Sequence, residues 1–346
     1  MSAGQVLVVG AIAFVGAAFL NSQTLLDMAE RQPYGWQRTV AVDLARPLHT
    51  VSQWTGLAKP GEKVDEARGR NSGSADSFDA LTSSTLPTVS SVAPPTTATG
   101  APTSAGAGPA ATDPATSAPT TAAAPTTVAP LRTPTAANPL TMWIGGDSMA
   151  SEVGSSLSRI AGETGVITPT LDARISTGLT RPDYFDWPAH LIDVVNQQNP
   201  EVMVVMFGAN DAQKMKLDGK VYDVSSPEWQ AEYRHRVDAV MTFLTQGGKR
   251  HVYWIGQPVM RAGDFDQKQI ILEGIYRDEA AKHPGVTFIH TRTMFAGPDG
   301  AFSAYLPDSS GKQVLMRAQD GVHFSLAGAN RVAALALQTV QSQYTP

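Results

Sequence analysis

Apolar and polar positions follow a regular alternation only in the second part of the chain, after about residue 140. There, short unbroken apolar runs are separated by stretches with helical spacing, the first of them Ser148 to Ile160. The apolar runs that we predict as strands are MWIGG from Met142, EVMVVMF from Glu201, HVYWIGQPV from His251 and VTFIHT from Val286. Continuous apolar strands that alternate with helices predict a parallel sheet covered on both faces. We therefore expect a three-layer, flavodoxin-like α/β domain over residues 140–346.

The N-terminal apolar run has a different character, because no charged side chain interrupts residues 5–20. Its length is that of a signal-peptide core, slightly short of a comfortable bilayer span. No small-residue cleavage site follows, so we predict an uncleaved signal anchor over residues 1–24. A buried soluble helix is the alternative. Arg31, Arg38 and Arg46 follow the run and would by themselves keep the rest of the chain cytoplasmic.

Two further segments precede the α/β domain. Residues 25–70 form a juxtamembrane segment, either an amphipathic stretch that lies on a membrane or docks a partner, or a short helical hairpin with surface aromatics. Residues 71–139 are dominated by Ala, Pro, Thr, Ser and Gly and contain few large apolar residues. Such a composition cannot offset chain entropy by burial, which predicts a disordered linker. A stalk of this kind favours an extracytoplasmic domain tethered to the cell membrane.

Charge and cysteine content exclude several classes of function. The net charge is −5 and no Lys/Arg cluster is present, so we expect no nucleic-acid partner. The chain has no cysteine, which excludes disulfides and cysteine nucleophiles. The histidines that show no metal-like spacing with carboxylates are His190, His235, His251, His283 and His290. We expect neither a metal nor a cofactor.

The predicted layout places three polar clusters at the carboxyl edge of the sheet, where α/β domains bind ligands. They are Asp147-Ser148 after the first strand, Gly208 to Asp211 after the second, and DGVHFS from Asp320 before the last helix. A serine nucleophile needs a base, the base needs an orienting acceptor, and the oxyanion needs donors. Ser148, His323 and Asp320 match the first three roles.

The oxyanion donors that we expect are the Ser148 backbone N–H, the Asn210 side chain and a glycine between these two clusters. The loop RISTGLTRPDYFDWP offers Gly178 for the third position, with Gly162 and Gly165 as nearby alternatives. Asp211 is expected to brace its own loop. Ser148 could alternatively be a plain helix N-cap, but the set of four residues in order favours a nucleophile.

The motifs GDS, a loop glycine, GxND and DxxH, in this order, resemble the SGNH/GDSL hydrolase superfamily from about Leu140 onward. The resemblance implies Ser148 as nucleophile, Gly178 and Asn210 in the oxyanion hole, His323 as base and Asp320 as its partner. GGDSMA replaces the GDSL of the superfamily name. With its anchor and stalk, the chain more closely resembles a group of exported bacterial SGNH proteins of uncharacterised function. This group is similar in layout to the partners of membrane-bound O-acyltransferases.

The glycine-bearing loop also carries candidate substrate-binding side chains, namely Arg174, Arg181, Tyr184 and Trp187. Aromatic rings could stack on a sugar and arginines could meet an anionic group. The alternative is a loop anchored by buried aromatics and salt-bridged arginines.

The sequence as a whole predicts a serine esterase or O-acyltransferase that acts through an acyl-Ser148 intermediate on acylated envelope carbohydrate. The same nucleophile, base and hole would serve both reactions, so the acceptor stays open. A non-catalytic cell-surface carbohydrate-binding module that retains the fold is the alternative, because a fold does not by itself imply a function.

Overall fold

The computed structural model describes residues 131–345 except 247, the helices over 36–55 and 75–83, and isolated positions between 16 and 29 and at 128 and 130. The centre of the molecule is a five-stranded parallel sheet of order β2-β1-β3-β6-β7. Its strands are β1 (Leu140–Gly146), β2 (Ile167–Ala173), β3 (Val202–Met206), β6 (His251–Ile255) and β7 (Val286–Ile289). This order is the 2-1-3-4-5 arrangement of flavodoxin-like folds.

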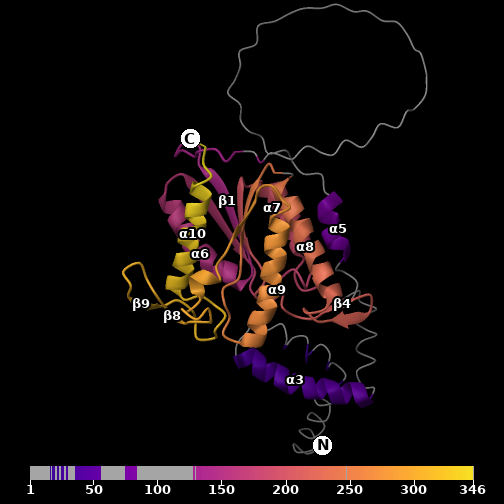
Figure 1. Ribbon diagram of the computed structural model, residues 1–346. Coiled ribbons are helices and arrows are strands. Elements are labelled where there is room, and N and C mark those ends of the chain that lie inside the picture. The colour runs from indigo at the N-terminus through magenta and orange to yellow at the C-terminus, as the bar shows by residue number, and fades with distance from the viewer. Residues whose placement is uncertain are drawn as a thin grey trace, which may run out of the picture.

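Helices cover both faces of the sheet, which makes three layers (Figure 1). On one face lie α6 (Ser148–Glu163) and α10 (Leu326–Gln341), packed on the β1 side chains Met142 and Ile144. On the other lie α7 (Trp187–Gln198), α8 (Pro227–Thr245) and α9 (Gly263–Ala280), packed on an aromatic-rich core with Trp143 and Trp254. Successive strand side chains point to opposite faces, so an unbroken apolar strand serves both cores.

The sequence pattern misses several elements. β2 reads as ITPTLDA, with Pro and Thr where an apolar run is expected, because it is an edge strand with only Ile167 buried. Two small hairpins lie outside the main sheet, namely β4 (Met215–Leu217) with β5 (Lys220–Tyr222), and β8 (Tyr305–Pro307) with β9 (Gln313–Leu315). A 3-10 turn, η1 (Thr293–Phe295), precedes the second hairpin.

The expected disordered linker over residues 71–139 is corrected at both of its described ends. Residues Ala75–Ser83 form helix α5, which packs on α7 and α8 with Phe78 fully buried. At the other end, Leu131 forms a bridge with Tyr344, and Arg132 makes an ion pair with Glu201 at 2.6 Å. Apolar side chains are sparse in this segment, but the few present suffice when an existing core receives them.

The predicted membrane anchor lies outside the described residues, apart from isolated positions. Among the helices that the structure describes, none is both long and apolar enough to cross a bilayer. Of the juxtamembrane segment, helix α3 (Trp36–Thr55) is described. It exposes the large apolar side chains Val40, Leu44 and Val51, which fits an amphipathic helix as well as a surface one.

Candidate active site

The candidate nucleophile lies where β1 ends and α6 begins. Gly146, the last residue of β1, has φ +137°, and a Cβ there would lie 2.0 Å from the Met206 carbonyl oxygen of β3. Only glycine fits this close approach of two strands. Asp147 then caps α6, and Ser148 is its first residue. The Ser148 N–H therefore belongs to the helix N-terminus, whose N–H groups have no acceptor within the helix.

Ser148, His323 and Asp320 are brought together from opposite ends of the domain. Ser148 Oγ lies 2.9 Å from His323 Nε2, and His323 Nδ1 lies 2.6 Å from Asp320 Oδ2. The second contact requires the proton on Nδ1, which leaves Nε2 to accept the Ser148 proton. The Ser-His-Asp geometry of a serine hydrolase is thus formed in the structure.

Local hydrogen bonds shape the loop that carries the base. Asp320 Oδ1 accepts from the N–H groups of Val322 and His323, at 2.8 and 3.0 Å. The carboxylate is therefore fixed by its own turn while Oδ2 holds the imidazole. On the inner side of the loop, the buried Arg317 guanidinium donates to the carbonyl oxygens of Val322 and His323, at 2.7 and 3.3 Å. Sequence reasoning gave no role to Arg317.

The electrostatics of the pair suit a general base. Burial by itself would raise the pKa of Asp320, but hydrogen bonds from His323 and from backbone N–H groups lower it to about 2. Burial would lower the pKa of His323, but the Asp320 hydrogen bond and the negative charges of Glu152, Asp320 and Asp147 raise it above the ordinary histidine value. Asp320 is therefore ionised at neutral pH, and its charge would stabilise an imidazolium formed by transfer of the Ser148 proton to His323.

Glu152 is a second residue that sequence reasoning missed. It lies on α6 four residues after Ser148, and its Oε2 accepts the Phe324 N–H at 2.8 Å. Residues i and i+4 share one face of a helix, so this spacing was the available signal. This bond ties α6 to the loop of His323. The negative charge of Glu152 also raises the pKa of His323.

The loop after β2 meets the loop after β3 at the same edge. Asn210 Nδ2 donates to the Thr177 carbonyl at 3.1 Å, and Asp211 Oδ1 accepts the Thr180 N–H at 2.8 Å. Gly178 sits directly on this carboxylate, since a Cβ there would meet Asp211 Oδ1 at 2.4 Å. Asp211 is fully buried and also accepts from the Tyr233 hydroxyl at 2.9 Å. Asp211 thus braces both loops that carry the expected donors.

The direction of the Gly178 N–H follows from the same contact. The Thr177 carbonyl and the Gly178 N–H belong to one peptide, and the described residues contain no cis peptide. In a trans peptide these two groups point in opposite directions. The carbonyl faces Asn210 Nδ2, so the Gly178 N–H points away from it. In this conformation Gly178 and Asn210 cannot share one acceptor, and Gly178 becomes a donor beside Asn210 only if the Thr177–Gly178 peptide turns.

The two alternative glycines lie elsewhere. Gly162 is in the last turn of α6, and Gly165 follows that helix just before β2 begins. Because α6 runs antiparallel to β1, its C-terminal end lies at the amino edge of the parallel sheet, opposite to Ser148. Gly178 is therefore the glycine of the three that the topology brings to the carboxyl edge.

The four candidate substrate-binding side chains divide into two groups. Trp187 has no exposed surface and donates its indole N–H to Thr177 Oγ1 at 3.0 Å, so it offers no face to a sugar and instead anchors the loop. Arg181 makes an ion pair with Asp183 at 2.7 Å. Arg174 pairs with Asp172 at 2.8 Å but keeps 47% of its side chain exposed, and Tyr184 is also 47% exposed. Arg174 and Tyr184 remain accessible to a ligand.

The described residues contain one group with the atoms of a metal site. Ligand atoms of Asp238, Glu279 and His283 lie within 4.8 Å of one another, between α8 and the end of α9. His283 Nε2 contacts Asp238 Oδ1 at 2.8 Å, and Glu279 pairs with Arg234 at 2.7 Å and Lys282 at 2.8 Å. Glu279 thus already has two cationic partners, and Asp238 has a histidine partner within the chain. The spacing along the sequence does not reveal this cluster, because it joins two helices.

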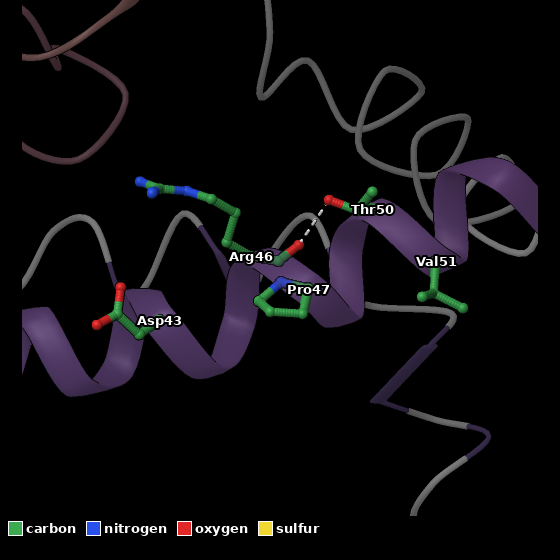
Figure 2. Close-up of a pocket in the computed structure, with 5 residues that line it drawn as sticks. All are labelled: Asp43, Arg46, Pro47, Thr50 and Val51. Carbon is green, nitrogen blue, oxygen red and sulfur yellow. Dashed lines mark hydrogen bonds between the residues drawn. The ribbon is translucent and has the colours of Figure 1, made fainter.

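A separate hollow of about 420 Å³ lies along α3 (Figure 2). The described residues that line it are Asp43, Arg46, Pro47, Thr50 and Val51. Thr50 Oγ1 donates to the Arg46 carbonyl at 2.9 Å, as the dashed line shows. All five of these described residues belong to α3, and none of them is a member of the Ser-His-Asp site.

Comparison with known proteins gives a family and a set of distant structural likenesses. A family model described as "Protein of unknown function (DUF459)" matches residues 141–339, more than half of the chain. No curated protein matches the sequence.

Three solved structures illustrate the likenesses. A mutant of an acetyl-xylooligosaccharide esterase from Geobacillus stearothermophilus is 17% identical, with a TM-score of 0.39 over 58% of this chain and 94% of the esterase. A GDSL-like lipase from Bacteroides thetaiotaomicron is 14% identical, with a TM-score of 0.38 over 58% of this chain and 88% of the lipase. A lipase from a goat rumen metagenome is 14% identical, with a TM-score of 0.37 over 58% and 97%. At these values we draw no functional conclusion from the likenesses.

Proposed function

We propose that this chain, which belongs to the DUF459 family, is a serine esterase or O-acyltransferase that works through an acyl-Ser148 intermediate. The observation that carries the proposal is the pair of contacts from Ser148 Oγ to His323 Nε2 at 2.9 Å and from His323 Nδ1 to Asp320 at 2.6 Å. A serine that served only as a helix cap would not need a base held by a carboxylate. The capping contact in this helix is in fact made by Asp147, which accepts the Met149 N–H.

The first half of the reaction forms the acyl-enzyme. Ser148 Oγ attacks the acyl carbon of the ester, and His323 Nε2 accepts the serine proton while Asp320 holds the imidazolium. The carbonyl oxygen becomes an oxyanion, which the Ser148 N–H and the Asn210 amide would stabilise. Asn210 Nδ2 has two hydrogens and donates one to Thr177, so the other is available. His323 then gives its proton to the departing alcohol, and the ester bond breaks.

The second half transfers the acyl group to an acceptor. An acceptor hydroxyl loses its proton to His323 and attacks the acyl-Ser148 carbon, and collapse of the second tetrahedral intermediate returns the proton to Ser148. With water as acceptor the protein is an esterase, and with a sugar hydroxyl it is an O-acyltransferase. Arg174, whose N–H donates to the Gly146 carbonyl at the end of β1, and Tyr184 on the same loop are both exposed. They are suited to a polar, sugar-like acceptor or substrate.

The proposed setting is the cell envelope. An uncharged stretch over residues 5–20 and a Pro/Thr/Ala-rich segment fit a single-pass anchor with the α/β domain on the extracytoplasmic side. Within the proposal, the substrate is an acyl ester of envelope carbohydrate, and a membrane-bound O-acyltransferase is the candidate partner. The second candidate function is a non-catalytic carbohydrate-binding module, which the exposed Tyr184 would also serve.

Incubation of the full chain with an activated acetyl ester tests the proposal. We expect intact mass spectrometry to show one acetyl adduct, absent in Ser148→Ala and retained in Ser155→Ala, an exposed serine on the same helix. Asn210→Ala should keep the fold and lower kcat about 10²- to 10³-fold, as loss of one oxyanion donor does elsewhere.

The acceptor that receives the acetyl group distinguishes an esterase from a transferase, and the absence of an adduct points to a non-catalytic protein. Discharge to water indicates an esterase, whereas discharge mainly to an added envelope-type oligosaccharide indicates a transferase. If wild type forms no adduct and its ester turnover equals that of Ser148→Ala and His323→Ala, the catalytic proposal fails. Oligosaccharide binding unchanged by Ser148→Ala would then support the binding module.

A further inference from the structure

Helix α5 lies far from the catalytic residues in sequence but is packed into the domain. It lies beside α8 (Figure 1), and it contacts both α7 and α8. Phe78 and Leu81, which are 0% and 2% exposed, join the same aromatic core as Trp187. On the outer side, Asp79 contacts His235 Nε2 at 3.1 Å. α5 is thus a docked segment of the α/β domain, although its neighbours in sequence are low in apolar residues.

Phe78 covers a buried arginine of α8. The Arg236 guanidinium carbon lies 5.1 Å from the centroid of the Phe78 ring, and the Arg236 side chain is 1% exposed. At this distance the ring face attracts the cation and excludes water from it. Arg236 Nε also pairs with Glu232 at 2.7 Å. The docked ring and the carboxylate together fix the orientation of the guanidinium.

Another donor of Arg236 reaches the loop that carries Gly178. Arg236 Nη1 donates to the Leu179 carbonyl at 2.8 Å, and Asp211 accepts the Thr180 N–H at 2.8 Å. This carbonyl and this N–H belong to the same peptide, which is therefore held at both of its polar ends. The neighbouring Thr177 carbonyl in turn receives Asn210 Nδ2. We name residues 177–180 the oxyanion loop.

We infer that α5 positions the oxyanion loop, through the contact of Phe78 with Arg236 and of Arg236 with the Leu179 carbonyl, and thereby holds the Asn210 amide in place. Phe78 and Arg236 are positioning residues that do not touch the substrate. The inference rests on the proposed function, since it concerns how the oxyanion donors of that site are held. Loss of α5 docking loosens the loop, and Asn210 then loses its fixed acceptor.

The test compares variants of the full chain at a temperature well below every melting point. Phe78→Ala removes the ring and its packing, Phe78→Leu keeps apolar volume but removes the ring face, and Arg236→Lys keeps the charge but loses the planar fork. Val340→Ala, in the core on the opposite face of the sheet, is the matched destabilised control. We expect Phe78→Ala and Arg236→Lys to lower kcat about 10-fold with KM changed less than 2-fold, a part of what loss of a whole donor costs. The kcat of Phe78→Leu should lie between that of these two variants and that of wild type. The kcat of Val340→Ala should equal that of wild type.

Hydrogen exchange provides a second readout that does not depend on activity. We expect Phe78→Ala to speed amide exchange in peptides that cover the oxyanion loop, with little change in the Val340→Ala control. Unchanged exchange in the loop, or a kcat that is unchanged or higher in Phe78→Ala and Arg236→Lys, overturns the inference. If wild type has no esterase or transferase activity, the proposed function fails on the adduct experiment, while faster loop exchange still supports the link from α5 to the loop.

Discussion

Glu152 shows how one side chain outside the proposed catalytic set acts on the proposed base, His323. Its carboxylate is tied to the Phe324 N–H, next to His323, and its negative charge favours the protonated imidazole. Burial raises the pKa of Glu152 itself, although the charge of His323 opposes this. The residue therefore couples helix α6 to the titration of the base rather than to the substrate.

We predict that Glu152→Gln moves the acid limb of the kcat/KM profile to lower pH. Catalysis needs neutral His323, so activity rises as the pH rises through the pKa of His323. Removal of the Glu152 charge makes protonation of the imidazole less favourable and lowers that pKa, while glutamine keeps an oxygen that can accept the Phe324 N–H. The check is a profile of kcat/KM against pH at constant ionic strength. Glu163→Gln, an exposed carboxylate on the same helix, should leave the limb where it is, and identical limbs in all three proteins would contradict the assignment.

At the scale of elements, Asp147 links the start of α6 to the loop after β3. Its two carboxylate oxygens accept different N–H groups, Met149 in α6 at 2.9 Å and Ala209 beyond β3 at 3.0 Å. The residue is fully buried, and burial together with the charge of Asp211 raises its pKa to about 7, against the effect of both N–H bonds. An N-cap thus also sets the distance between Ser148 and the loop of Asn210.

We predict that Asp147→Asn lowers the free energy of unfolding by about 1–3 kcal/mol at neutral pH, because the new NH₂ group faces one of the two N–H donors and leaves it unpaired. In wild type the folded-state pKa lies above the unfolded value, so the folded state binds the proton more tightly. The Asp147 contribution to stability is then present at low pH and is lost as the pH rises from about 4 to about 7. Urea unfolding at several pH values should show that the free energy of unfolding changes less with pH in Asp147→Asn than in wild type. The control is Asp186→Asn, which changes the cap of α7 and should alter the free energy of unfolding by no more than about 0.5 kcal/mol at any pH. If the stability of Asp147→Asn depends on pH as strongly as that of wild type, the role assigned to Asp147 is refuted.

At the scale of the whole molecule, the domain is closed by segments from both of its ends. Leu131 bridges Tyr344 after α10, Arg132 pairs with Glu201 before β3, and α5 covers α7 and α8. The domain boundary that the alternating pattern places at residue 140 therefore omits parts of the folded unit.

We predict that a chain that begins at Leu140 is less stable than one that begins at Ala75 by roughly 3 kcal/mol or more, since it loses the burial of Phe78, Leu81 and Leu131. A chain that begins at Leu131 should lie between the two. Denaturant midpoints of the three chains check this, with the slope of each transition compared to confirm that a single cooperative unit unfolds. Equal midpoints would mean that α5 and residues 131–139 contribute nothing to the fold.

The sequence alone predicted the layered α/β architecture, and it singled out Ser148, His323 and Asp320, whose side chains meet in the structure. This was possible because a parallel sheet buries both faces of its central strands, so each of these strands has a continuous apolar sequence. Polar residues that directly follow such strands then lie at the same edge of the sheet. Edge strand β2 escaped this logic, since it has little apolar surface to reveal it. Helix α5 escaped it as well, because two buried side chains in a polar segment carry no clear period.

Only the tertiary structure decided what holds the site together. The contacts of Glu152 with the His323 loop, of Asp211 with the Gly178 loop and of Arg236 with Leu179 join residues far apart in sequence. Glu, Asp and Arg lie mostly on solvated surfaces, so their presence in a sequence does not reveal such contacts. The direction of the Gly178 N–H likewise depends on which way one peptide faces, and a sequence pattern does not specify that orientation. The residue types that perform chemistry are written locally, whereas their orientation is set by long-range contacts that exist only after the chain has folded.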